Sequence, residues 1–234
     1  GIKYDALVVD EGQDINRKQW DSLLWSLHDP YKNPVYIFHD NNQKVYNKDE
    51  LDLPDFPKYP HILKKNYRNS QDIFATQKSY YKGESTTSEG PKGESVSYFI
   101  APTREIAEKK IINLINKYTI NEGMDKKQIA ILTGNKLGTS SSILGNYLTK
   151  DFNGKKKDNL YFVKAEKNEE DEIVFDSIKR FKGLEREIVI LFDLEDALEN
   201  PEEMYIGLSR PKLILDIIGT EKNIEILNKI SEDG

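Results

Sequence analysis

The stretch from Tyr4 to Asp14 reads Y-D-A-L-V-V-D-E-G-Q-D, and it decides the fold that we expect. Its apolar run, Ala6 to Val9, is long enough for one buried strand. The run ends abruptly in two acids, Asp10 and Glu11. In open α/β sheets the carboxyl ends of the strands face the ligand crevice, so we expect these carboxylates to line a binding site.

Two adjacent carboxylates at a strand end are costly unless a cation meets them, and Mg²⁺ is the usual cation. We therefore predict Asp10 and Glu11 as ligands of Mg²⁺, with Glu11 also orienting or activating a water for attack on a phosphate. The alternative is a buried strand followed by a helix that Asp14 caps, where acids are favoured by the helix dipole. The D-E pair alone leaves both interpretations open.

Composition excludes several classes of protein. The 234 residues contain no cysteine and three scattered histidines, which excludes disulfides and argues against a zinc site. No apolar stretch approaches the ~20 residues of a membrane span, and no signal peptide opens the sequence, so we expect a cytoplasmic protein. The net charge of -6 implies that any nucleic-acid binding depends on local basic clusters.

Apolar runs alternate with helical periodicity along the chain, which predicts an α/β fold with mostly parallel sheets covered by helices. A stretch rich in Gly, Ser and Thr, residues 82–95, predicts a boundary between units 1–84 and 85–234. The expected strands are 6–9, 35–38, 62–63, 96–101, 129–132, 160–163, 173–177, 188–193 and 213–218. The expected helices are 14–27, 70–81, 102–118, 141–148, 202–209 and 224–230.

Four further stretches carry chemistry: H-D-N-N-Q-K-V-Y at 39–46, L-K-K-N-Y-R-N-S at 63–70, S-I-K-R-F-K-G-L-E at 177–185 and M-Y-I-G-L-S-R-P-K at 204–212. Together with D-E-G-Q-D, in this order, they resemble the second to sixth motifs of UvrD/Rep-like superfamily 1 helicases. The resemblance covers nearly the whole chain. It implies a partial RecA-like domain over 1–84 and a second RecA-like domain over 85–234.

The resemblance implies ATP and Mg²⁺ as cofactors. Gln43 would contact the γ-phosphate or the attacking water, and Arg68 and Arg210 would bind γ-phosphate oxygens, which suits guanidinium groups. Glu11, Gln43, Arg68 and Arg210 are thus the predicted catalytic set. Proline at 211, where the family has alanine, should end the helix near Arg210. The predicted nucleotide-binding residues are Gln13, Asp40, Tyr67 against the adenine, Gly183 and Glu185 on a ribose hydroxyl.

The same resemblance implies single-stranded DNA as partner. Lys179, Arg180 and Lys182 form a compact basic cluster suited to phosphates. Ser177 stands where the family contacts the strand, and Tyr46 offers an aromatic face for a base, although packing of its loop is favoured. The alternative for the basic cluster is a solvated charged face. His39 and Lys179 depart from the usual glycine and histidine of the family.

The chain contains no G-x-x-x-x-G-K-[ST] phosphate-binding loop. In the family that loop precedes the D-E strand, so we expect a missing amino-terminal RecA-like half in the intact protein. We therefore expect the carboxyl-terminal portion of an ATP-dependent DNA helicase or translocase. The alternatives are a nucleotide-switched ATPase or interaction module without duplex unwinding, and an inactive structural homologue.

Overall fold

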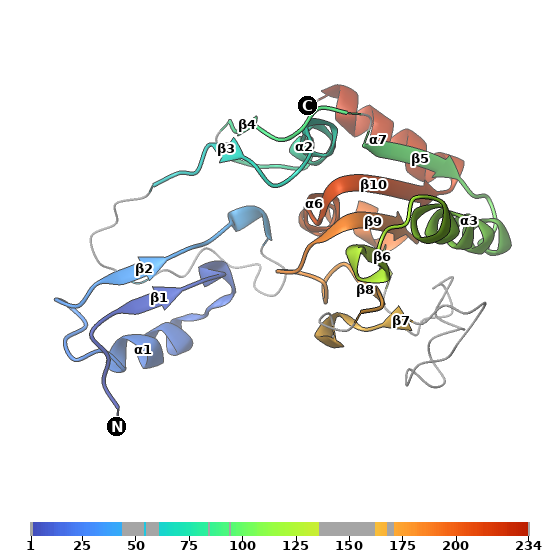
Figure 1. The fold of residues 1–234 in the computed structure, drawn as a ribbon. Coiled ribbons are helices and arrows are strands. Elements are labelled where there is room, and N and C mark those ends of the chain that lie inside the picture. Colours follow the sequence, from blue (N-terminus) through green and yellow to red (C-terminus); the bar gives the residue numbers. More distant parts are fainter. Residues whose placement is uncertain are drawn as a thin grey trace. The chain divides into compact units, whose positions relative to one another are not determined.

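The computed structural model describes residues 2–43, 54, 61–83, 85–93, 95–135, 162–167 and 171–233. The chain divides into two compact units, Gly1–Leu63 and Lys64–Gly234. Within both units the strands pair in parallel and helices lie beside them (Figure 1).

The first unit contains a two-stranded parallel sheet of β1 (Leu7–Val9) and β2 (Val35–Ile37). Short 3-10 helices, Gly12–Asp14 and Asn41–Gln43, follow the two strands. The helix α1 (Arg17–Trp25) buries Trp20.

The cap of α1 differs from the one that the sequence suggested. Asn16, not Asp14, caps the helix: its side chain accepts from the Gln19 amide at 3.1 Å, and the Gln19 side chain accepts from the Asn16 amide in return. This reciprocal capping box satisfies two donors that the first turn leaves unpaired. Asp14 belongs instead to the preceding 3-10 helix.

The second unit contains a six-stranded, all-parallel sheet in the order β5-β10-β9-β6-β8-β7. This arrangement confirms the expected α/β class with a parallel sheet flanked by helices. The strands are β5 (Val96–Ile100), β6 (Ile129–Thr133), β7 (Phe162–Val163), β8 (Ile173–Ser177), β9 (Arg186–Phe192) and β10 (Pro211–Gly219). The helices are α2 (Gln71–Lys78), α3 (Arg104–Asn116), α5 (Glu195–Leu198), α6 (Pro201–Ser209) and α7 (Glu221–Asp233).

Both faces of this sheet are covered. Helix α3 shares a core with alternate residues of the central strands, among them Ile131, Phe175 and Ile190. The intervening residues, such as Leu132 and Leu191, are also fully buried. Because successive strand residues point to opposite faces, burial of both sets requires cover on each side. Helices α2, α6 and α7 also pack against β10.

The region around residue 64 differs most from expectation. Ile62 and Leu63 form no strand, and the strand begins later, as β3 (Lys65–Asn66), which pairs with β4 (Thr87–Ser88). Helix α2 packs against α6 and β10, so it belongs to the second unit. The division between the compact units therefore falls at residues 63/64, whereas the glycine-rich stretch suggested 84/85.

Some expected features lie outside the described residues, including the helix at 141–148, the turn at 154–158 and most of the loop at 47–60. In the described part of the chain, the expected strand at 160–163 is β7. No helix there has the length and apolar character to cross a membrane.

Candidate functional site

Five predicted residues of the first unit form one hydrogen-bonded set at the strand ends. The side-chain nitrogen Nε2 of Gln13 donates to Glu11 Oε2 at 2.6 Å. The side-chain oxygen Oε1 of Gln13 accepts from the backbone N–H of Asp40 at 3.0 Å. Gln43 Nε2 donates to Asp40 Oδ2 at 2.9 Å. Asp10 Oδ1 accepts from the Glu11 amide at 2.9 Å. Two motifs that lie apart in the sequence are thus joined side chain to backbone, with the buried Gln13 at the junction.

The backbone turns sharply at Glu11. Glu11 adopts a left-handed conformation with φ of 52°, which non-glycine residues rarely adopt and which costs energy unless the surroundings impose it. The next residue must be small, because a Cβ on Gly12 would lie 2.6 Å from Ile37 Cγ2. Gly12 was not predicted as important, although its place directly after D-E was a signal for such a turn.

The carboxylates of this set suit Mg²⁺ in chemical type. Asp10 and Glu11 supply oxygen donors, and Mg²⁺ in phosphate sites keeps several waters and uses only one or two carboxylates. Across the residues that the structure describes, no three His, Cys, Asp or Glu side chains are grouped to hold a metal ion by themselves.

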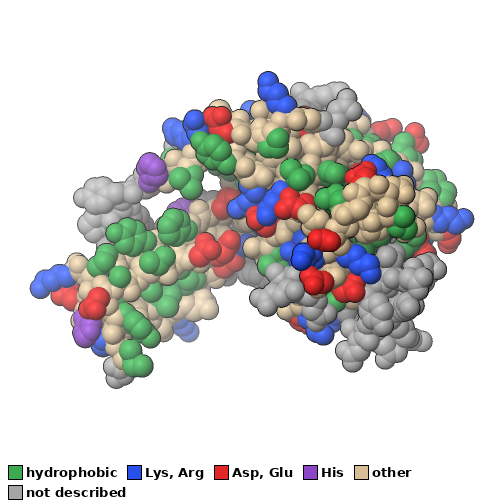
Figure 2. Space-filling view, viewed as in Figure 1, with side chains coloured by type: hydrophobic (Ala, Val, Ile, Leu, Met, Phe, Trp, Pro, Cys, Tyr) green, Lys and Arg blue, Asp and Glu red, His purple; other side chains and the backbone are tan. Residues whose placement is uncertain are grey.

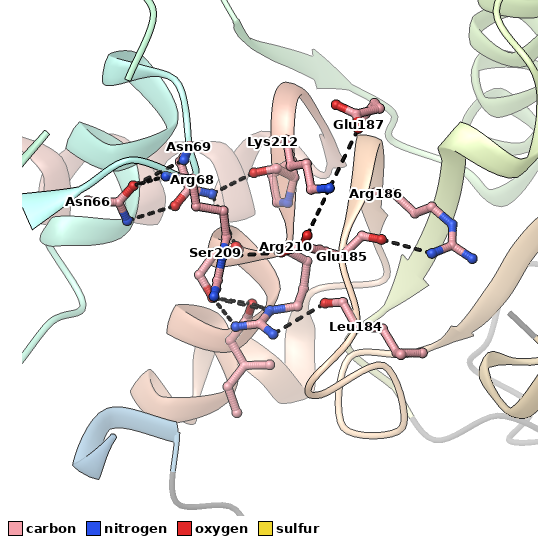
Figure 3. Close-up of polar contacts among 12 residues, drawn as sticks. Asn66, Arg68, Asn69, Leu184, Glu185, Arg186, Glu187, Ser209, Arg210 and Lys212 are labelled. Carbon is pink, nitrogen blue, oxygen red and sulfur yellow. Dashed lines mark hydrogen bonds and ion pairs between the residues drawn. The ribbon is translucent and has the colours of Figure 1, made fainter. Parts of the chain in front are cut away.

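In the second unit, Glu185 lies between two cations (Figure 3). Its Oε2 is 3.2 Å from Arg68 Nε, and its Oε1 is 2.8 Å from Lys212 Nζ. Lys212 Nζ is also 3.6 Å from Glu187 Oε1. The hydrogen bond from Lys212 holds the pKa of Glu185 below its usual value, although partial burial opposes this, and raises the pKa of Lys212 in return. The sequence reasoning missed Lys212, which stands two residues after Arg210.

Asn69 joins the N-Y-R segment to the S-R-P segment. Its buried side-chain nitrogen donates to the carbonyl oxygens of Ser209 at 3.1 Å and Pro211 at 2.6 Å. The Ser70 amide donates to the Lys212 carbonyl at 3.0 Å. Nothing in the sequence pattern had singled out Asn69, because its partners are backbone atoms about 140 residues away.

Arg210 is buried, with only 3% of its surface exposed. Its guanidinium donates to the Ile206 carbonyl at 3.0 Å, to Ser209 Oγ at 2.7 Å and to the Leu184 carbonyl at 3.3 Å. Arg210 is also the C-cap of α6, so the helix ends where Pro211 was predicted to end it. In this conformation Arg210 ties the end of α6 to the K-G-L-E segment.

Two further predicted nucleotide-binding residues, Tyr67 and Gly183, are distinguished by exposure and by backbone conformation, respectively. Tyr67 is 69% exposed, so its ring is available to a flat ligand. Gly183 has φ of +80°, which a residue with a Cβ adopts only with strain. The K-G-L-E segment therefore needs its glycine for backbone geometry.

The predicted nucleic-acid residues that the structure describes lie elsewhere on the second unit, and their charges are partly compensated. Lys179 Nζ is 3.0 Å from the buried carboxylate of Glu203. Arg180 contacts Asp176 at 3.1 Å and Glu166 at 2.9 Å. On the face seen in Figure 2, basic and acidic side chains of this unit are interspersed. Ser177, half-buried, ends β8, Lys182 is half-buried, and Tyr46 lies outside the described residues.

The predicted nucleic-acid residues of the second unit and the Glu185 and Arg210 group lie at opposite ends of the strands in the six-stranded sheet. The carboxyl edge and the amino edge are the sides of the sheet where its parallel strands end and begin, respectively. Ser177 ends β8 and is level with Thr133 and Phe192, which mark the carboxyl edge. Glu185 directly precedes β9, and Arg210 directly precedes β10, so both lie at the amino edge. The fifth-motif segment, 177–185, thus runs from one edge to the other. One end of the segment contributes Lys179 and Arg180, and the other contributes Glu185, so the segment belongs to two separate groups of residues.

Comparison with known proteins gives matches among solved structures but none in sequence. No protein-family model matches the sequence, and no curated protein matches it. The fold is similar to the crystal structure of the C-terminal domain of a possible DNA helicase from Lactobacillus plantarum. The identity is 16% and the TM-score 0.47, over 66% of this chain and 87% of the other. At these values the likeness supports no assignment of activity.

Proposed function

We propose that this chain is part of an ATP-dependent helicase or translocase similar to the UvrD/Rep-like enzymes of superfamily 1. In the complete protein, two RecA-like domains would bind and hydrolyse ATP and couple hydrolysis to movement on single-stranded DNA. The partial and the second RecA-like domain are proposed to correspond to the compact units Gly1–Leu63 and Lys64–Gly234.

The observation that carries this proposal is the meeting of three motif segments at one edge of a sheet. Arg68 contacts Glu185, Asn69 contacts the backbone of Ser209 and Pro211, and Arg210 contacts the backbone of Leu184. These segments are far apart in the sequence and bear the residues that suit phosphate and ribose. A nucleotide site of the proposed kind requires these segments to lie together.

The roles proposed for the residues follow from their chemistry. Asp10 and Glu11 would hold Mg²⁺, whose charge would neutralise phosphate oxygens, and Glu11 would orient the attacking water. Gln43 and Arg68 would contact the γ-phosphate. Arg210 would serve the same phosphate only after leaving its present acceptors, so its role depends on a rearrangement.

The second candidate is a nucleotide-switched ATPase or interaction module that does not unwind duplexes. The observation that favours it is the pairing of Lys179 with Glu203 and of Arg180 with Asp176 and Glu166. Cations that are already neutralised release fewer counterions on binding nucleic acid, which weakens the electrostatic contribution to affinity.

One experiment separates the candidates. The complete protein is assayed for ATP hydrolysis with and without single-stranded DNA, and for displacement of a labelled strand from a partial duplex. A helicase shows both activities, and Glu11→Gln abolishes both while ATP still binds. The matched control is Glu225→Gln, an exposed glutamate on α7. Hydrolysis without displacement supports the second candidate, and the absence of ATP hydrolysis contradicts both.

A further inference from the structure

Four charges alternate in sign along one line of contacts at the amino edge of the second unit. They are Arg68, Glu185, Lys212 and Glu187, with separations of 3.2, 2.8 and 3.6 Å between successive members. The two oxygens of Glu185 are divided between the cations, one for Arg68 and one for Lys212. Glu185 therefore keeps a partner when either cation leaves.

The two contacts of Glu185 differ in strength. Lys212 is the closer cation, and its hydrogen bond is the main cause of the lowered pKa of Glu185, with the charge of Arg68 contributing less. The Arg68 and Glu185 side chains are 49% and 41% exposed. Exposed pairs of this kind contribute only about 0.2–1 kcal/mol, so a competing anion can displace Glu185 from Arg68 at small cost.

The backbone of Arg68 is held, although its side chain is exposed. The Arg68 amide donates to Asn66 Oδ1 at 3.0 Å, and the next residue, Asn69, is fixed to the carbonyl oxygens of Ser209 and Pro211. The guanidinium can therefore change partners while its Cα stays in place. Phosphate oxygens can accept from guanidinium bidentately, whereas only one oxygen of Glu185 faces Arg68 because the other contacts Lys212.

We propose that Lys212 is a positioning residue for the nucleotide site, and that Arg68 rests on Glu185 until a phosphate group takes its guanidinium. Lys212 then keeps Glu185 ionised and in place. This inference rests on the proposed function, since it assumes that a polyphosphate reaches Arg68. It assigns to Lys212, which had no predicted role, the task of holding Glu185 while Arg68 changes partner.

The test uses inorganic tripolyphosphate as the probe, because it competes for Arg68 and has no ribose for Glu185 to bind. Binding to the complete protein is measured by calorimetry at constant ionic strength. Glu185→Gln releases Arg68 and is expected to tighten binding by about two- to fivefold, as the loss of an exposed pair predicts. Arg68→Ala is expected to remove that gain in the double variant.

Lys212→Met is expected to weaken tripolyphosphate binding, because Glu185 then depends on Arg68 alone, and Lys212→Arg is expected to restore it. The matched control is Lys126→Met, which removes one positive charge and an ion pair to Glu172 of similar exposure. It should change binding little. Thermal unfolding of each variant checks that the fold persists.

Either of two results with Glu185→Gln overturns the inference: no tightening of binding, or a tightening that persists without Arg68. An equal loss in Lys126→Met and Lys212→Met also overturns it, since the effect is then one of net charge. Failure of the proposed function is a distinct result, in which the unmodified protein binds neither ATP nor tripolyphosphate.

Discussion

The ion pair between Lys179 and Glu203 limits how far Lys179 is available to bind nucleic acid. Burial raises the pKa of Glu203, and Lys179, 3.0 Å away, lowers it again. The carboxylate is 3% exposed, so it depends on this lysine for a charged partner. A role for Lys179 on nucleic acid therefore competes with a role in stability.

We predict that Lys179→Met lowers the free energy of unfolding at neutral pH by about 1–3 kcal/mol, the cost of leaving a buried polar group unpaired. The loss should shrink as the pH falls. A raised carboxyl pKa gives stability that is complete below the unfolded pKa and lost as the pH rises through the folded pKa. Urea unfolding at about pH 5 and about pH 8 measures the difference.

The double variant with Glu203→Gln is the control for Lys179→Met and should recover most of the loss. A variant that is fully stable at both pH values but binds single-stranded DNA weakly would show that Lys179 serves nucleic acid rather than Glu203.

The variant Arg210→Ala tests whether Arg210 stabilises the fold, contacts a phosphate, or does both. Removing the guanidinium leaves the carbonyl oxygens of Ile206 and Leu184 without this donor, so we predict a loss of about 1–3 kcal/mol in unfolding free energy. If Arg210 also reaches a phosphate, turnover by the complete protein falls by about 10³-fold or more while ATP binding persists. Urea unfolding and steady-state ATP hydrolysis separate the two effects.

Unchanged stability in Arg210→Ala together with lost turnover would assign the residue to phosphate alone. Lost stability with near-normal turnover per folded molecule would assign it to the junction between α6 and the K-G-L-E segment.

At the scale of secondary-structure elements, a buried pair connects the end of α3 to strand β10 of the sheet. The Tyr118 hydroxyl, in the π-helical turn Lys117–Asn121 that follows α3, donates to Asp216 Oδ2 in β10 at 2.6 Å. Burial raises the pKa of Asp216, and the hydroxyl of Tyr118 partly offsets this. The pKa of Tyr118 is raised as well, chiefly by burial.

We predict that Asp216→Asn flattens the pH dependence of stability. Because the folded pKa of Asp216 is raised, its contribution is complete below the unfolded pKa and is lost as the pH rises through the folded value. The asparagine variant should therefore keep its unfolding free energy at about pH 8, and Tyr118→Phe should lose stability there. A fall of more than about 1 kcal/mol in Asp216→Asn at this pH would contradict the prediction.

Element types were predictable where the periodicity was strong. The strands β1, β2, β5, β6, β8 and β9 and the helices α2, α3, α6 and α7 appear near their expected positions. Strand β3 could not be predicted, because Lys65 and Asn66 have no apolar pattern and are paired only through contact with β4. Helix α1 begins later than expected because Asn16 and Gln19 form a better cap than Asp14.

The candidate site was predictable in its residue types and less so in its connections. The acids and amides after β1 and β2 were predicted as site residues, and the parallel pairing of the two strands makes them neighbours. Asn69 binds the backbone of Pro211, and Lys212 pairs with Glu185. Both are tertiary contacts, which leave no recognisable pattern in the sequence around each residue. The charges of Lys179 and Arg180 are likewise compensated by acids from other segments of the chain, Glu203 and Glu166.

At the scale of the whole chain, we predict negligible ATP hydrolysis by these 234 residues alone. The sequence contains no phosphate-binding loop of the G-x-x-x-x-G-K-[ST] type, whose lysine and backbone amides hold the phosphates. Steady-state hydrolysis is measured with and without single-stranded DNA. Robust turnover that Glu11→Gln abolishes would contradict the prediction.

The path of residues 178–185 has a mechanical consequence. The segment leaves β8 at its carboxyl end and enters β9 at its amino end, and residues 178–183 form hydrogen-bonded turns. A helical turn advances only about 1.5 Å per residue, and the distance to cover is about 20 Å along β9. While these turns hold, the segment has little spare length between β8 and β9. We expect a pull on Lys179 at one edge to be felt as tension at Glu185 on the other.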